Sequence, residues 1–180
     1  MRQQSQFAYL QGVGYQAVDL PYLDRQMAML IILPEDGNFE EFESGLNAAL
    51  FNETVDTMSS TTVSLTMPKF EYEFDLPLNN ALTEMGMVDA FDEAKANFSA
   101  MANLGAAREN LFISDVLHKA FIKVDENGTE AAAATLGMIS ATSMPVEIIE
   151  LELNRPFLFA IYDKQTNTIL FIGRMMNPAD

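Results

Sequence analysis

The sequence contains no cysteine and only one histidine. Without cysteine there is no disulfide bridge, no thiolate nucleophile and no cysteine-based zinc site, although the cellular compartment stays open because many secreted proteins also lack disulfides. Basic side chains are scarce as well: 10 Lys and Arg stand against 26 Asp and Glu, which gives a net charge of −16. The acidic residues are spread along the chain, so its surface would repel nucleic-acid phosphates and anionic lipid headgroups. We therefore expect neither nucleic acid nor a membrane among the partners.

Long hydrophobic runs are also missing. Runs such as Met27–Leu33 and Ile169–Ile172 are far shorter than the roughly 20 residues that cross a bilayer. The acidic residues do not follow the spacing of a calcium-binding loop, so we expect no metal site, and no cofactor is implied. With 180 residues, 49% of them hydrophobic, the chain is long enough for one sizeable core and one domain. Its first residues are as compatible with an internal position in a longer protein as with a true N-terminus.

Most of the apolar patterning is typical of β-strands. Tyr15–Leu20 alternates and predicts a half-exposed strand, whereas Met27–Leu33 is continuously apolar and predicts a strand buried on both faces. Thr61–Phe74 alternates on both sides of a proline, which fits two strands or one long bent strand. The further strand candidates are Leu111–Val124, Val146–Leu153, Phe157–Tyr162 and Thr168–Met175. Polar turn residues predict hairpins at 21–25 and 163–167.

Helical patterning is limited to short stretches. Phe39–Leu50 repeats apolar residues at intervals of three and four, which predicts a surface helix. Leu78–Met85, ended by a glycine, and Ala90–Ala96 are two more helix candidates, and Ile113–Ala120 taken alone fits a helix as well as a strand. The chain is therefore expected to be rich in strands, with a few short helices.

Four separated segments resemble the serpin family, and they do so in the family's order. Residues 87–99 read Met-Val-Asp-Ala-Phe-Asp and then Ala-Asn-Phe-Ser, similar to the family's Gly-Met-x-Asp-Ala-Phe region. Residues 114–121, Ser-Asp-Val-Leu-His-Lys-Ala-Phe, resemble the strand that leads into the serpin hinge. Residues 125–135, Asp-Glu-Asn-Gly-Thr-Glu-Ala-Ala-Ala-Ala-Thr, resemble the hinge, and residues 151–161 resemble the signature around Asn-Arg-Pro-Phe. A single motif of this kind is weak, but four in order are strong.

The resemblance implies an α+β, multi-sheet serpin-type fold, of which residues 1–180 would be the C-terminal half of one domain. The reactive loop would then lie at about 125–145, which we call the reactive segment. A full-length member of this kind would be no enzyme but a suicide inhibitor of serine, or of cysteine, proteases. The implied partners are a target protease and a missing N-terminal serpin segment, and the family favours a secreted, extracellular location. The alternatives are a non-inhibitory serpin-like binding protein and an inactive truncated fragment.

The hinge can also be examined by strand geometry alone. It comprises Glu126, Gly128, Thr129, Glu130, Ala131, Ala132, Ala133, Ala134 and Thr135. Side chains of a strand alternate between its faces, so an inward Thr129 brings small or uncharged residues inward at every second position up to Ala141. The one charge of the stretch, Glu130, falls on the opposite face, and an inward charge would be costly. The segment can therefore enter a β-sheet, although Glu130–Ala134 is also a good helix former in isolation.

The scissile bond follows from the family's hinge-to-bond spacing, which leads to Thr142-Ser143. The bonds Ala141-Thr142 and Ser143-Met144 remain alternatives. Because no Lys or Arg lies between Lys123 and Arg155, a trypsin-like enzyme with an acidic specificity pocket finds no basic side chain here. Elastase-like, subtilisin-like or some cysteine proteases are the better targets.

The single histidine, His118, admits three interpretations. Ser114 and Asp115 precede it, but spacing in the sequence does not make a catalytic triad, which is defined by geometry. In the serpin family a histidine at this place lies where the central sheet opens and hydrogen-bonds across strands. A core histidine with satisfied hydrogen bonds is the third interpretation.

Overall fold

The computed structural model describes residues 1–101, 110–125 and 148–178. The chain divides into two compact units, one of residues 1–70 with 124–180 and one of residues 71–123. Each unit is described by itself below. Among the described residues, no helix is long and apolar enough to cross a membrane.

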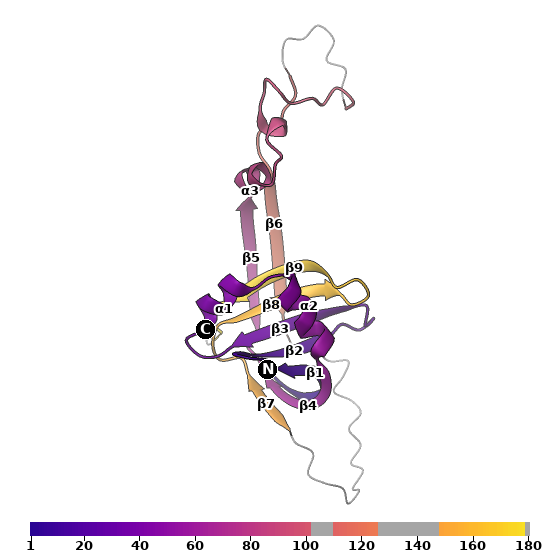
Figure 1. The fold of residues 1–180 in the computed structure, drawn as a ribbon, viewed down its shortest axis with the longest axis vertical. Coiled ribbons are helices and arrows are strands. Elements are labelled where there is room, and N and C mark those ends of the chain that lie inside the picture. Colours follow the sequence, from indigo (N-terminus) through magenta and orange to yellow (C-terminus); the bar gives the residue numbers. More distant parts are fainter. Residues whose placement is uncertain (102–109, 126–147, 179–180) are drawn as a thin grey trace, which may run out of the picture. The chain divides into compact units, whose positions relative to one another are not determined.

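The first unit is built on a seven-stranded sheet with the order β7-β4-β1-β2-β3-β8-β9 (Figure 1). Neighbouring strands run antiparallel except β4 and β7, which are parallel. The strands are β1 (Arg2–Gln11), β2 (Tyr15–Pro21), β3 (Met27–Pro34), β4 (Ser59–Thr66), β7 (Ile149–Glu152), β8 (Phe157–Asp163) and β9 (Thr168–Met175). The two predicted hairpins are confirmed, since β2 pairs with β3 and β8 with β9.

The core lies on both faces of the central strands. Strand β3 is buried along almost its whole length, as its continuous apolar run predicts. On one face the helices α1 (Phe39–Gly45) and α2 (Ala48–Thr57) pack their Phe39 and Phe51 into a cluster with residues of β2, β3 and β8 (Figure 1). Phe51 meets Tyr162 edge to face, with ring centroids 5.4 Å apart. On the other face Phe70 lies against the rings of two phenylalanines of β8.

Two expectations for this unit are wrong in detail. Strand β2 was expected to be half-exposed, but it is mostly buried because it lies between β1 and β3 in the middle of the sheet. The helix expected over Phe39–Leu50 is two helices, since Leu46 is extended and Asn47 begins α2. The Asn47 side chain accepts hydrogen bonds from the backbone N–H groups of Ala49 and Leu50, as an N-cap does.

Strand β1 was not among the expected strands. Its first residues are Arg-Gln-Gln-Ser-Gln, whose polar character hides the alternation that becomes visible only at Phe7 and Tyr9. It forms because β2 and β4 pair with it on both sides. Residues 61–74 are two strands, which resolves the alternative left open by the sequence.

The second unit contains a two-stranded sheet and short helices. Strand β5 (Phe70–Pro77), whose first residue belongs to the first unit, pairs with β6 (Leu117–Val124), and α3 (Asn79–Glu84) follows β5. The helix expected to end at Gly86 is confirmed; this glycine has a φ of 101°, a conformation that suits glycine. The helix expected over Ala90–Ala96 is reduced to a single 3₁₀ turn at Asp89–Phe91.

Candidate functional site

Most of the predicted site lies outside the described residues. This holds for Glu126, Gly128, Thr129, Glu130, Ala131, Ala132, Ala133, Ala134, Thr135, Ala141, Thr142, Ser143 and Met144. The structure describes the two strands that flank this stretch in the chain, β6 before it and β7 after it. These strands define how the reactive segment is attached.

Strand β6 leads into the reactive segment and is joined to β5 by ion pairs. The Lys119 ammonium lies 3.1 Å from Asp75 and 3.9 Å from Glu73, and the Lys123 ammonium lies 2.9 Å from Glu71. The pairing order runs in opposite directions along the two strands, so they are antiparallel. All five side chains are more than half exposed, so the pairs add little stability but keep one face of this ribbon polar.

The opposite face of the β5–β6 ribbon is apolar. Alternation places Tyr72, Phe74 and Leu76 of β5 on this face, away from the acidic residues of the same strand. Tyr72 is half-buried, and this burial raises the pKa of its hydroxyl. Phe74, by contrast, is 52% exposed. Phe121 of β6, 62% exposed, lies on the polar face between the lysines. The ribbon is therefore amphipathic and carries large apolar side chains at its surface.

The residues before β6 are held by an asparagine that sequence reasoning missed. The strand expected over Leu111–Val124 begins only at Leu117. Just before it, Asn79 donates from Nδ2 to the Ser114 carbonyl at 2.8 Å and accepts at Oδ1 from the Val116 N–H at 2.8 Å. An amide that pairs with a neighbouring backbone in this way fixes the chain as another strand would. The sequence gives no signal for it, because the partners are 35 and 37 residues away.

His118 lies on β6 with its side chain exposed. It has no hydrogen-bond partner in the described part of the chain. Ser114 and Asp115 are both exposed, and neither forms a side-chain hydrogen bond with His118 there. The catalytic interpretation therefore gains no geometric support, and the buried core histidine is not what the structure has. The role at a sheet opening stays a prediction. No group of three or more His, Asp or Glu side chains suited to a metal ion occurs in residues 1–101, 110–125 and 148–178.

Strand β7 receives the chain after the reactive segment. It was expected over Val146–Leu153, and in the described residues it spans Ile149–Glu152 at one edge of the seven-stranded sheet. It pairs in parallel with β4, from Val63 opposite Ile149 to Thr66 opposite Glu152. Leu151 points into the core and is 2% exposed. The reactive segment is thus attached to an edge strand that has a single neighbour, β4, in the part of the chain that the structure describes.

The connection from β7 to β8 contains the Asn-Arg-Pro-Phe motif. The Arg155 Nε donates to the Pro34 carbonyl at the end of β3, at 2.8 Å. Phe157 follows and is completely buried. The motif therefore joins the exit of the reactive segment to the core of the first unit.

Comparisons with known proteins agree with this arrangement. A family model described as serpin (serine protease inhibitor) matches residues 1–178. An uncharacterized serpin-like protein of Thermococcus kodakarensis is 43% identical over 100% of this chain and 41% of its own length. The leukocyte elastase inhibitor of Xenopus laevis is 37% identical over 96% of this chain and 45% of its own length.

Solved structures give the same result. The crystal structure of tengpin, a thermophilic serpin in the native state, superposes with a TM-score of 0.79 at 36% identity, over 98% of this chain and 45% of tengpin. The chain thus spans less than half the length of the relatives it matches. The expected α+β, multi-sheet serpin-type fold is confirmed. With the family model covering almost the whole sequence, the chain belongs to the serpin family.

Proposed function

We propose that the protein containing this chain inhibits proteases by presenting the reactive segment as a substrate and trapping the enzyme after the first cleavage step. The observation that carries this proposal is the alternation of the segment between β6 and β7. Its every second residue from Thr129 to Ala141 is small or uncharged, and the single carboxylate of the stretch falls on the other face. A loop that never enters a sheet has no physical reason to keep one face free of charge.

The proposed covalent step is the acylation half of peptide hydrolysis. The hydroxyl oxygen of the protease serine forms a bond to the carbonyl carbon of Thr142, the peptide bond to Ser143 breaks, and the Ser143 nitrogen leaves with the proton. Ala141-Thr142 and Ser143-Met144 are the alternative bonds. A thiolate of a cysteine protease would react in the same way. The acyl bond then ties the enzyme to the C-terminal end of the segment that follows β6.

Insertion into the sheet supplies the driving force. Among the described residues β6 has a strand neighbour, β5, on one side only. A strand that continues from β6 through residues 125–128 and turns back along its other side would extend this sheet. About ten new backbone hydrogen bonds at ~1 kcal/mol each would release on the order of 10 kcal/mol, which is comparable to the stability of a whole domain.

The proposed targets are proteases that accept small or apolar side chains. No Lys or Arg occurs between Lys123 and Arg155, so the segment has nothing for an acidic specificity pocket. The residues around Thr142 are small or apolar, which suits elastase-like and subtilisin-like enzymes. The name of the Xenopus relative, an elastase inhibitor, is in line with this target class.

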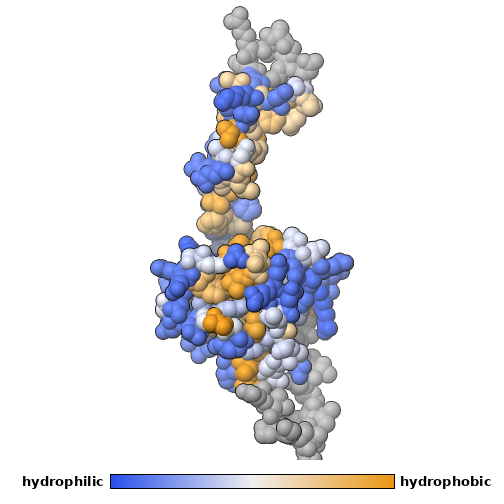
Figure 2. All heavy atoms as spheres, viewed as in Figure 1, coloured by the Kyte–Doolittle hydropathy of each residue, from blue (hydrophilic) through white to orange (hydrophobic). Residues whose placement is uncertain are grey.

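We further propose that residues 1–180 are the C-terminal half of one serpin domain and that an N-terminal serpin segment completes it. Strand β9 exposes four consecutive apolar residues, Ile169, Leu170, Phe171 and Ile172, by 38% to 58%. Side chains of one strand point to opposite faces, so both faces of this edge strand are incompletely covered. Figure 2 shows hydrophobic residues at the surface of both units. Such surface is typical of a face that another polypeptide covers.

The test uses the natural gene product that contains this chain, incubated with an elastase-like serine protease. We expect a covalent complex that survives SDS and a mass spectrum of the released segment that begins at Ser143. The variant Thr129→Arg puts a charge on the inward face and should be cleaved as a substrate without trapping the enzyme. Its control, Glu130→Arg, puts the same side chain on the outward face and should still trap it.

A second candidate is an inactive fragment, favoured by the share of 41% to 45% of the relatives' length. A non-inhibitory binding protein is the further alternative. Simple cleavage without a stable complex, in a protein that also carries the N-terminal segment, would favour the non-inhibitory relative. Trapping that appears only after the N-terminal segment is supplied would identify the isolated chain as the fragment.

A further inference from the structure

Strand β7, which receives the chain after the reactive segment, is a short element. It has four residues, lies at a sheet edge and pairs only with β4 among the described strands. Two leucines, Leu151 and Leu153, each 2% exposed, hold it from inside the core. Beyond the ladder, the Leu153 N–H donates to the Thr66 carbonyl at 2.8 Å. A two-stranded parallel contact of this length offers few hydrogen bonds, so side chains on the outer face contribute to its register.

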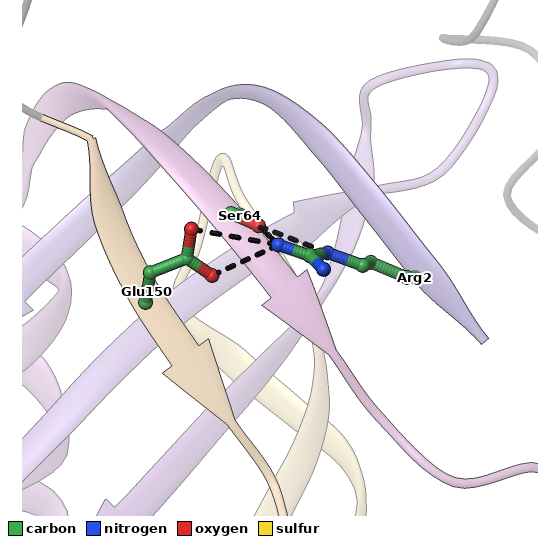
Figure 3. A network of polar contacts seen from close by, with 3 residues as sticks. All are labelled: Arg2, Ser64 and Glu150. Atoms are coloured by element: carbon green, nitrogen blue, oxygen red, sulfur yellow. Dashed lines mark hydrogen bonds and ion pairs between the residues drawn. The ribbon is translucent and has the colours of Figure 1, made fainter.

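An arginine from a non-neighbouring strand provides such a contact. Arg2 of β1 reaches across β4 to β7, as Figure 3 shows. Its Nε and Nη2 donate to the Ser64 hydroxyl at 3.3 and 3.1 Å, and Nη2 also donates to the Glu150 carboxylate at 3.2 and 3.5 Å. Ser64 pairs with Glu150 in the β4–β7 register. One guanidinium therefore connects three strands at the point where β7 is attached.

The contact with Ser64 increases the contribution of the Arg2–Glu150 ion pair to the stability of β7. Arg2 and Glu150 are each 67% exposed, and an isolated pair of this exposure would contribute little because two long side chains lose rotamer freedom. Ser64 is 1% exposed and stands between the buried Val63 and Leu65, so its hydroxyl holds the guanidinium in place before Glu150 is engaged. The rigid fork of arginine can bond to both groups at once, which a lysine cannot reproduce.

We infer that Arg2 is a positioning residue for the reactive segment: through Ser64 and Glu150 it fixes strand β7 and thereby the C-terminal attachment of the segment. This inference rests on the proposed function. A segment whose C-terminal end is anchored to a sheet samples fewer conformations before it meets a protease than one with a loose end, and preorganisation of this kind favours binding. Loosening β7 is therefore expected to slow capture of the protease.

The direct test is hydrogen exchange, in Arg2→Gln, of those backbone amides among residues 149–152 that point toward β4, namely Ile149 and Leu151. We expect these amides to exchange about two to five times faster, the size of effect that a modest ion pair supports. The matched control is Arg174→Gln, which removes another arginine–glutamate pair of the first unit, between β9 and Glu43 of α1, at 2.9 Å. This control should leave residues 149–152 unchanged. Glu150→Gln should behave as Arg2→Gln does, and the double variant should be no worse than either single one.

The functional readout is the rate constant for formation of the SDS-stable complex. It should fall by a similar factor in Arg2→Gln and not in Arg174→Gln, and raising the salt concentration should narrow the difference. If the amides of β7 exchanged equally fast in Arg2→Gln and Arg174→Gln, the inference that Arg2 fixes β7 would be overturned. If Arg2→Gln speeds exchange in β7 as expected but the wild-type protein forms no complex at all, the proposed function fails. The conclusion that Arg2 fixes β7 then still stands.

Discussion

The ion pair between the buried Asp19 and the partly exposed Lys164 gives the sharpest test of the first unit's energetics. Asp19 lies on β2 with a side chain 3% exposed, and its Oδ2 pairs with the Lys164 ammonium. Its Oδ1 accepts a hydrogen bond from the Tyr162 hydroxyl at 3.1 Å. The perturbation is Lys164→Met, which keeps the aliphatic part of the side chain and removes the ammonium, so that the carboxylate loses its cation.

The magnitude follows from the burial of each partner. Removing one member of a fully buried ion pair destabilises a protein by about 3–5 kcal/mol, because the other charge stays behind without compensation. The Lys164 side chain is 36% exposed, so water screens this pair and replaces part of the lost interaction. Asp19 also keeps its bond from Tyr162. We therefore expect Lys164→Met to lower the free energy of unfolding by about 2 kcal/mol.

Urea unfolding followed by far-ultraviolet circular dichroism measures this change, since the sequence offers no tryptophan fluorescence. The control Arg174→Met breaks an ion pair whose partners are 58% and 34% exposed and should lower the free energy of unfolding by less than about 1 kcal/mol. Adding Asp19→Asn to Lys164→Met should recover most of the loss, because the uncompensated charge disappears while the amide oxygen still accepts from Tyr162. The reasoning would be refuted if Lys164→Met and Arg174→Met lowered the free energy of unfolding equally. It would also be refuted if adding Asp19→Asn to Lys164→Met lowered that free energy further.

Three further predictions concern the first unit. Burial, and then the charge of Asp19, raise the pKa of Tyr162, so the hydroxyl loses its proton at a lower pH in the unfolded chain than in the folded one. The free energy of unfolding should therefore be constant with respect to this group below about pH 10 and fall above it, and it should fall less steeply in Tyr162→Phe. A Cβ at Gly173 would lie 2.4 Å from the buried Phe159 ring, so Gly173→Ala should lower the melting temperature and the free energy of unfolding by about 1–3 kcal/mol, whereas Gly45→Ala, with nothing within 4 Å, should not. Asn47→Ala removes the cap of α2 and should lower the free energy of unfolding by about 1 kcal/mol in the same assay.

The strands that the sequence predicted well are those whose burial is uniform. Met27–Leu33 is apolar throughout and forms the buried inner strand β3, both faces of which are covered. Strand β1 escaped prediction because its polar first half is stabilised by pairing with β4 rather than by its own pattern. The break after Gly45 was also missed, although Asn47 before an alanine pair is a recognisable cap signal.

For the candidate site, sequence motifs and three-dimensional contacts carry different information. The hinge and the Asn-Arg-Pro-Phe motif are contiguous, so a resemblance could be read from them directly. The contacts that attach the flanking strands join residues far apart: 148 residues separate Arg2 from Glu150, and 37 separate Asn79 from Val116. No local pattern marks such pairs before the sheet order and register are known.

The open edge formed by β9 bears on how this chain behaves in concentrated solution. An edge strand with four adjacent apolar side chains is a template on which a strand of another molecule can add, the first step of aggregation. At neutral pH the charge of −16 makes the molecules repel one another and opposes that step. Acidification toward the isoelectric point near pH 4.2 neutralises most of the net charge and removes the repulsion while leaving the edge unchanged, so colloidal stability of the chain on its own should reach its minimum there.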